Sequence, residues 1–153
     1  MPHYDTDEEA TRRAHQDERA GKSASTQAGE FVREEMHHVR EGKHGARSPQ
    51  QVIAIGLSKA RRAGVKLNPP KGGSHSKIRR QAERDLKKGR SAGRRRTSRA
   101  RSRASLGALK REGRSSAAHA KLSRQAQAAA RRRGSNSRPN TARKAARSRA
   151  KNR

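Results

Sequence analysis

The sequence predicts a mostly α-helical protein with extensive disorder, for three reasons. Hydrophobic residues make up only 27% of the 153 residues, whereas charged residues make up 35%. The apolar residues of the first half recur at helical spacing, and the second half is a low-complexity mixture of Arg, Lys, Ala, Ser and Gly. We therefore expect a short αα-hairpin and a candidate third helix between a disordered acidic N-terminus and a disordered, basic, low-complexity C-terminal tail.

Residues 1–25 are expected to form a disordered segment of mixed charge. Up to residue 41 the chain has ten acidic and six basic residues, a net charge of −4. The chain has one Tyr, one Phe and no Trp, and a chain with little apolar surface cannot offset the entropy lost on ordering. We interpret the acidic start as a solubilising segment, with attraction to the basic end of the chain as the alternative.

Residues 26–68 have the pattern of an αα-hairpin. The first helix is expected over 27–41, and Gly42 follows as a candidate C-cap. The mainly apolar stripe of this helix, with Glu35 at its margin, consists of Phe31, Val32, Met36 and Val39.

The second helix of the hairpin has the clearest start and stop signals in the chain. Ser48 is a good N-cap, Pro49 suits the first helical position, and Gln51 completes a capping box. Gly64 ends the helix, and the prolines at positions 69 and 70 prevent its continuation. The expected helical face consists of Val52, Ile53, Gly56, Leu57 and Ala60.

The hairpin offers only about ten sizeable apolar side chains, the lower limit for independent folding. It therefore needs a third element, a second copy of itself or a ligand. A Pro- and Gly-containing linker at residues 69–76 leads to a short helix expected over 77–89, in which Ile78, Ala82 and Leu86 recur every four residues. The linker leaves open whether this helix packs on the hairpin.

Residues 90–153 form the basic Arg/Lys/Ala/Ser tail. Residues 115–133 have high helix propensity. We expect a helix there that is only marginally stable by itself and becomes more stable when phosphates neutralise its basic side chains. From residue 71 to the end, 29 Lys or Arg stand against three acidic residues, a net charge of +26. Such an excess of one sign is tolerable when a polyanion neutralises it.

The charge of the tail predicts binding to nucleic acid, with duplex DNA as the favoured partner. Phosphate contacts supply affinity without base selectivity, which suits nucleoid-associated, histone-like compaction or protection of DNA. The tail has no aromatic residue, and RNA modules usually stack bases on aromatic side chains. The candidate phosphate contacts are Arg79, Arg80, Lys87, Lys88, Arg94, Arg95, Arg96, Arg99, Arg101, Arg103, Lys110, Arg111, Lys121, Arg124, Arg131, Arg132, Arg133, Arg143, Lys144 and Arg147.

Two alternatives stay open beside DNA binding. One is an RNA- or ribosome-associated basic protein, because Arg can also stack on bases. The other is a protein-interaction adaptor whose tail only localises it, with self-association through the hairpin as a related interaction. No stretch approaches about 18 consecutive apolar residues, so we expect no integral membrane association.

The sequence suggests neither a cofactor nor a metal, and we expect no enzyme. His37, His38 and His44 lie near Glu34, Glu35 and Glu41 and raise a metal hypothesis. Adjacent histidines point to different sides of a helix, however, and no third ligand is fixed, so we favour no metal site. The chain has no cysteine, and no Gly-rich phosphate loop, carboxylate pair or catalytic triad is identifiable.

Two segments resemble a family of small basic bacterial proteins defined by an uncharacterised helical domain. They are EFVREEMHHVREGKHG (Glu30 to Gly45) and QVIAIGLSKARRAG (Gln51 to Gly64). ALKREGRSSAAHAKLSRQAQAAARRRG (Ala108 to Gly134) is similar to the tails of longer members. Members are often labelled DNA-binding or plasmid stabilisation proteins. The resemblance implies no catalytic residues and a bacterial cytoplasmic setting, in which we expect association with the nucleoid.

Overall fold

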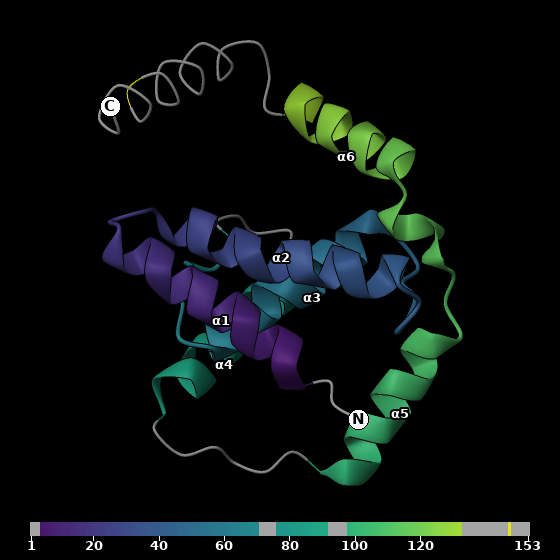
Figure 1. Cartoon of the computed structure of the whole chain (residues 1–153), viewed down its shortest axis with the longest axis horizontal. Coiled ribbons are helices and arrows are strands. Elements are labelled where there is room, and N and C mark those ends of the chain that lie inside the picture. Colours follow the sequence, from purple (N-terminus) through teal and green to yellow (C-terminus); the bar gives the residue numbers. More distant parts are fainter. Residues whose placement is uncertain (1–3, 71–75, 92–97, 133–146, 148–153) are drawn as a thin grey trace. The chain divides into compact units, whose positions relative to one another are not determined.

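The computed structural model describes residues 4–70, 76–91, 98–132 and 147, and over these residues it is 78% helical. They form two units, one ending at Ala117 and one beginning at Ala118. The predicted mostly α class is confirmed, and the described residues contain no strand. The prediction of a short hairpin with extensive disorder is wrong for these residues, because they form six α-helices (Figure 1).

The predicted disorder of the acidic N-terminus is the largest error. Residues Tyr4–Arg19 form helix α1, which packs on α2 (Figure 1). Ala10 and Ala14 are buried and share a core cluster with Phe31 and Val65. Alanine is the best helix former and lets two helices approach closely. Among the α1 side chains whose burial is described, residues 7–19, none is a buried large apolar one.

The two helices of the predicted hairpin are α2 (Ala24–Arg40) and α3 (Pro49–Arg62), and they pack against each other. Ser23 caps α2, so this helix begins three residues earlier than the predicted residue 27. Gly42 and Gly64 follow the C-caps of α2 and α3 with φ of 77° and 103°. This left-handed conformation favours glycine, which explains why the predicted helix ends are accurate.

The start of α3 follows the prediction in part. Ser48 is the N-cap, and its side chain accepts a hydrogen bond from the Gln51 backbone N–H at 3.3 Å. The Gln51 side chain does not complete the reciprocal bond of a capping box. It accepts instead from the backbone N–H of Arg47, one residue before the cap, at 2.8 Å.

Replacing Ser48 by alanine is expected to lower the free energy of unfolding by about 1 kcal/mol, because the Gln51 N–H in the first turn of α3 loses its side-chain acceptor and keeps only the Ser48 carbonyl at 3.1 Å. Urea unfolding followed by circular dichroism measures the change. Ser102→Ala in the interior of α5 (Arg99–Lys110) is the matched control. It should be neutral or slightly stabilising, and an equal loss in both variants would contradict the capping role.

The candidate third helix is α4 (Ser76–Arg90), and it packs on α3. Ala82 and Asp85 face the hairpin, and Asp85 is 1% exposed. Its Oδ2 accepts a hydrogen bond from Ser58 Oγ at 2.6 Å. The predicted apolar repeat is only partly buried, since Ile78 is 59% exposed.

Part of the predicted tail belongs to the folded unit. After α5, the loop and a short 3₁₀ helix (Arg114–Ala117) lie against the hairpin. The backbone N–H groups of Gly45 and Ala46 donate to the carbonyls of Leu109 (2.9 Å) and Gly113 (3.1 Å). Ala117 is buried with Val39 and Val52 in a second core cluster. The extra elements that the hairpin requires are therefore supplied by the same chain.

Helix α6 (His119–Arg132) lies in the second unit, inside the predicted helical range 115–133, and none of its residues is buried. The rest of the predicted tail, at residues 92–97, 133–146 and 148–153, lies outside the described residues. None of the described helices is both long and apolar enough to cross a membrane.

Candidate functional site

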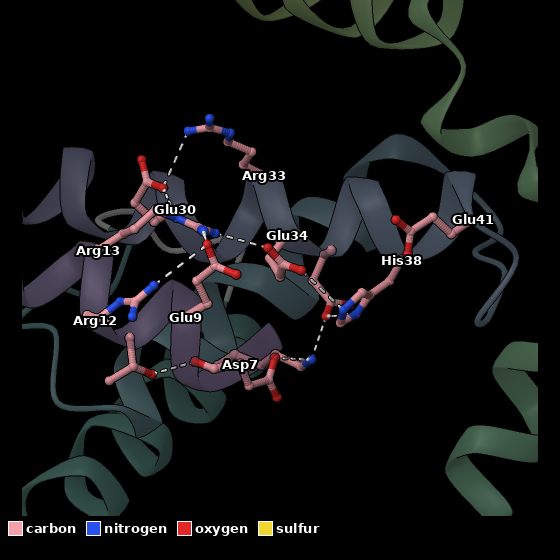
Figure 2. A network of polar contacts seen from close by, with 12 residues as sticks. Asp7, Glu9, Arg12, Arg13, Glu30, Arg33, Glu34, His38 and Glu41 are labelled. Atoms are coloured by element: carbon pink, nitrogen blue, oxygen red, sulfur yellow. Dashed lines mark hydrogen bonds and ion pairs between the residues drawn. The ribbon is translucent and has the colours of Figure 1, made fainter. Parts of the chain in front are cut away.

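An ion-pair network joins α1 to α2, with Arg13 at its centre (Figure 2). The Arg13 guanidinium lies 2.7 Å from Glu30 and 3.0 Å from Glu34, both on α2, and 2.7 Å from Glu9 on α1. Burial alone would lower the pKa of Arg13, but its hydrogen bonds to Glu30 and Glu34 and the charge of Glu9 raise it. A fixed guanidinium fork suits several carboxylates at once, so the acids of the N-terminal region are partners within the fold.

The network continues into a buried polar cluster formed by Glu35, His38, His44 and Lys59. Glu35 is 1% exposed, although its place in the sequence put it at the margin of the apolar stripe. Its Oε1 lies 2.5 Å from Lys59 Nζ on α3. Lys59 Nζ also pairs with Asp7 of α1 at 2.9 Å, so the cluster connects three helices.

Two histidines face the Glu35 carboxylate. His38 Nδ1 lies 3.4 Å from Oε1, and His44 Nε2 lies 3.3 Å from Oε2. Neither Glu35 oxygen has a well-aligned hydrogen bond, so these are contacts between charged or polar groups at short range. The two imidazole rings are edge to face, with centroids 5.9 Å apart.

The second nitrogen of each histidine has its own oxygen partner. His44 Nδ1 lies 3.0 Å from the Gly45 carbonyl oxygen, which accepts its N–H. His38 Nε2 lies 3.4 Å from Glu34 Oε1 (Figure 2). Each ring is thus held between an outer oxygen and the Glu35 carboxylate.

The pKa shifts in the cluster follow from burial and from these partners. Burial alone would raise the pKa of Glu35, but His38, His44 and Lys59 hold it well below its usual range. Glu35 raises the pKa of His44 against the effect of burial. Burial would lower the pKa of Lys59, and Glu35 and Asp7 raise it. The carboxylate of Glu35 therefore stays ionised and attracts positive charge.

The structure brings together only part of the histidine and glutamate set that the sequence suggested. His37 and Glu41 are exposed, and Glu41 pairs with Lys43 at 2.9 Å. Glu35, His38 and His44 place one ligand atom each within 4.8 Å of one another. The spacing of Glu35 and His38 at i and i+3 was a usable signal, and the glycine turn after α2 returns His44 to the same face.

The basic side chains predicted to bind phosphate are on the surface wherever the structure describes them. Arg79 pairs with Glu83 at 3.0 Å. The other exposed candidates are Arg80, Lys87, Lys88, Arg99, Arg101, Arg103, Lys110, Arg111, Lys121, Arg124, Arg131, Arg132 and Arg147. The candidates outside the described residues are Arg94, Arg95, Arg96, Arg133, Arg143 and Lys144.

Helix α6 gathers four of these cations on one face. At about 100° per residue, its cations lie in a sector of about 100°. They are Lys121, Arg124, Arg131 and Arg132. Leu122, Ala126 and Ala129 lie on another side of the helix, so α6 combines a cationic face with a small apolar face.

Comparison with known proteins gives no match to a family model, to a curated protein or to a solved structure. The resemblance of residues 30–45, 51–64 and 108–134 to a bacterial family stays a prediction, and the function is inferred from the residues themselves.

Proposed function

We propose that the protein binds duplex DNA through its phosphates, with little base selectivity, and compacts or protects it as a nucleoid-associated, histone-like protein. One observation carries the proposal: most described acidic residues of the folded unit have an ion-pair partner within it, while the candidate cations of α4, α5 and α6 face solvent. The N-terminal acids pair with Arg13, Lys22 and Lys59 of the first three helices and their connection. This pairing argues against the alternative that the acidic start neutralises the basic end.

The charge supports affinity that depends steeply on salt. Duplex DNA presents a phosphate about every 1.7 Å of its axis, and each neutralised phosphate releases condensed cations. From Lys121 to Arg132, α6 extends about 16 Å, a length over which the duplex presents about ten phosphates. The cationic face of α6 can therefore lie along the backbone, and neutralisation there removes the repulsion among its own side chains.

The hairpin is not required to dimerise for this function. Its apolar faces are covered by α1, α4 and the 3₁₀ helix of the same chain. The hairpin therefore does not need a second copy of itself to complete its apolar core. In this proposal the folded unit anchors the basic helices, and α6 supplies phosphate contacts.

The adaptor alternative has one specific observation in its favour. A groove between α3 and α4 is lined by Leu57, Leu67, Ile78 and Ala82, and Ile78 is largely exposed. A stable protein partner that survives nuclease and high salt would support this second function. Loss of all partners after nuclease treatment would support nucleic-acid binding.

The test is a salt series of duplex DNA affinity for the full chain and a variant in which Lys121, Arg124, Arg131 and Arg132 are glutamine. We expect a steep salt dependence for the full chain and a slope smaller by about 3.6 for the variant, since each of the four lost phosphate contacts removes about 0.9 from it. Single-stranded RNA of equal length tests the RNA alternative in the same series.

The matched control leaves α6 unchanged and removes four exposed cations from the folded unit that ends at Ala117. In this control Arg12, Arg19, Arg33 and Lys66 are changed to glutamine. It has the same net charge as the α6 variant. If both variants lose equal affinity, long-range charge and not α6 determines binding. A shallow salt slope for the full chain, or stronger binding to RNA than to the duplex, would overturn the proposal.

A further inference from the structure

We propose that Glu35, His38 and His44 form a binding site for one divalent transition-metal ion, with Zn²⁺ as the fitting ion, between α2 and the loop that follows it. The site is separate from the cations of α4 to α6, and the proposal does not depend on DNA binding. Its basis is the geometry and burial of three side chains of metal-ligating type.

The spacing of the ligand atoms suits tetrahedral zinc. Zinc binds histidine nitrogen and carboxylate oxygen at about 2.0–2.2 Å, which places neighbouring ligands of a tetrahedron about 3.3–3.5 Å apart. His44 Nε2 lies 3.3 Å from Glu35 Oε2, and His38 Nδ1 lies 3.4 Å from Glu35 Oε1. The two distances run to different oxygens of Glu35, and one ligand atom from each of the three residues lies within 4.8 Å of the others. With the carboxylate bound through one oxygen, three protein ligands leave one position for water.

The outer partners orient both rings for metal binding. Zinc-bound histidines usually donate their other N–H to a carbonyl or a carboxylate, which fixes the tautomer and raises the basicity of the ligating nitrogen. The Gly45 carbonyl accepts the Nδ1–H of His44 at 3.0 Å, and the Glu34 carboxylate lies 3.4 Å from Nε2 of His38, where it could take the same role. His44 Nε2 and His38 Nδ1, which lie 3.3 and 3.4 Å from the Glu35 carboxylate, would then be the ligating nitrogens.

Glu35 is 1% exposed, and a buried carboxylate is tolerable only beside positive charge. Lys59 Nζ, 2.5 Å from Oε1, supplies one such charge, and a metal ion would add a second on the side of the two histidines. Both Glu35 oxygens are buried without an aligned hydrogen bond. Oε1 already has the Lys59 ammonium, and a metal ion among the three groups would give Oε2 a cationic partner as well.

Lys59 does not block the site. Its ammonium contacts both Glu35 and Asp7, so it keeps a carboxylate partner when a metal takes Glu35. The ligand set also selects the ion, because imidazole suits zinc and its neighbours, whereas Mg²⁺ and Ca²⁺ prefer oxygen ligands and Cu(I) prefers sulfur. The bound ion would tie the 42–48 loop to α2, and that loop donates hydrogen bonds to the last turn of α5 and to the loop after it.

The experiment uses the full chain, freed of nucleic acid at high salt and of metal by a chelator. Zn²⁺ titration by calorimetry measures affinity and stoichiometry, and Co²⁺ reports coordination by its visible absorption. The variants are His44→Gln, which removes a ligand, and Glu34→Gln, which removes an outer partner. His37→Gln is the matched control, because His37 lies on the same helix next to His38 but is exposed.

We expect one zinc per chain and the intense Co²⁺ absorption of a tetrahedral site. Glu34→Gln should weaken zinc binding about 10- to 100-fold, His44→Gln should weaken it more, and His37→Gln should leave it unchanged. Absence of binding, a weak octahedral Co²⁺ spectrum, or equal losses in His37→Gln and His44→Gln would overturn the site. If His44→Gln does not fold, ¹⁵N chemical shifts of His44 in the unmodified chain decide, since zinc must move the Nε2 signal.

Discussion

Replacing Gly56 by alanine is expected to lower the free energy of unfolding by about 2–3 kcal/mol, even though alanine is the better helix former. Gly56 is buried in α3 where that helix crosses α2. A Cβ built there would lie 2.6 Å from Val32 Cα and 2.9 Å from Val32 N. Because these are backbone atoms, the overlap can be relieved only by moving one helix away from the other.

The opposing effect is helix propensity, which favours alanine by about 1 kcal/mol. Gly29→Ala isolates it, because Gly29 is in α2, is exposed, and a Cβ there meets nothing within 4 Å. Urea unfolding followed by circular dichroism should show Gly29→Ala as stabilising and Gly56→Ala as destabilising. If Gly56→Ala is as stable as Gly29→Ala, α2 and α3 do not approach closely at this point.

The hairpin could be predicted from the sequence because its signals are local. Ser48 and Pro49 mark the start of α3, and Gly42 and Gly64 adopt the left-handed conformation that ends each helix. Each signal acts within a few residues and does not depend on the rest of the fold. These are also the positions at which predicted and observed boundaries agree best.

Helix α1 could not be predicted in the same way, because what stabilises it is distant in sequence. Its buried residues Ala10 and Ala14 are too small to make an apolar stripe. Arg13 and Glu30 look like unpaired charges in the sequence and form an ion pair only when α1 folds back across 17 positions. The high charge of the N-terminal region therefore led to a prediction of disorder, whereas its charged side chains pair with one another in the folded structure.

The candidate metal site could be predicted only in part, because some of its contacts are local in sequence and others are distant. Glu35 and His38 share a helix face, and a local pattern predicts that. Lys59 and Asp7, which complete the charge balance, are 52 residues apart, and no local pattern connects them. The same separation explains why Glu35 was placed at the margin of an apolar stripe: its partner on α3 makes burial of its charge tolerable.

Replacing Lys59 by methionine in the metal-free protein is expected to cost about 3–5 kcal/mol, because it leaves the buried Glu35 carboxylate without its ammonium partner. Lys59 Nζ is 2.5 Å from Glu35 Oε1, and the side chain of Glu35 has almost no contact with water. Methionine keeps most of the length and apolar surface of lysine, so the change mainly removes the charge. Urea unfolding in the presence of a chelator measures the loss.

The matched control is Lys66→Met, which removes an exposed charge and should change stability by less than about 0.5 kcal/mol. The double variant Glu35→Gln/Lys59→Met should recover part of the loss, because the carboxylate that lacks a partner is then absent. Equal effects of Lys59→Met and Lys66→Met would mean that Lys59 does not neutralise Glu35.

Zinc connects this prediction to the proposed metal site. If Zn²⁺ binds at Glu35, His38 and His44, its charge takes over the neutralisation that Lys59 provides. Loss of the competing ammonium on Glu35 should make the variant bind zinc more tightly than the unmodified chain. The cost of Lys59→Met should then be smaller with zinc than with chelator, because stabilisation of the folded state grows with affinity for the ion. An identical cost with and without zinc would show that zinc does not neutralise Glu35 and that Lys59 does so by itself. The two histidines would then belong to the ion-pair cluster and not to a metal site.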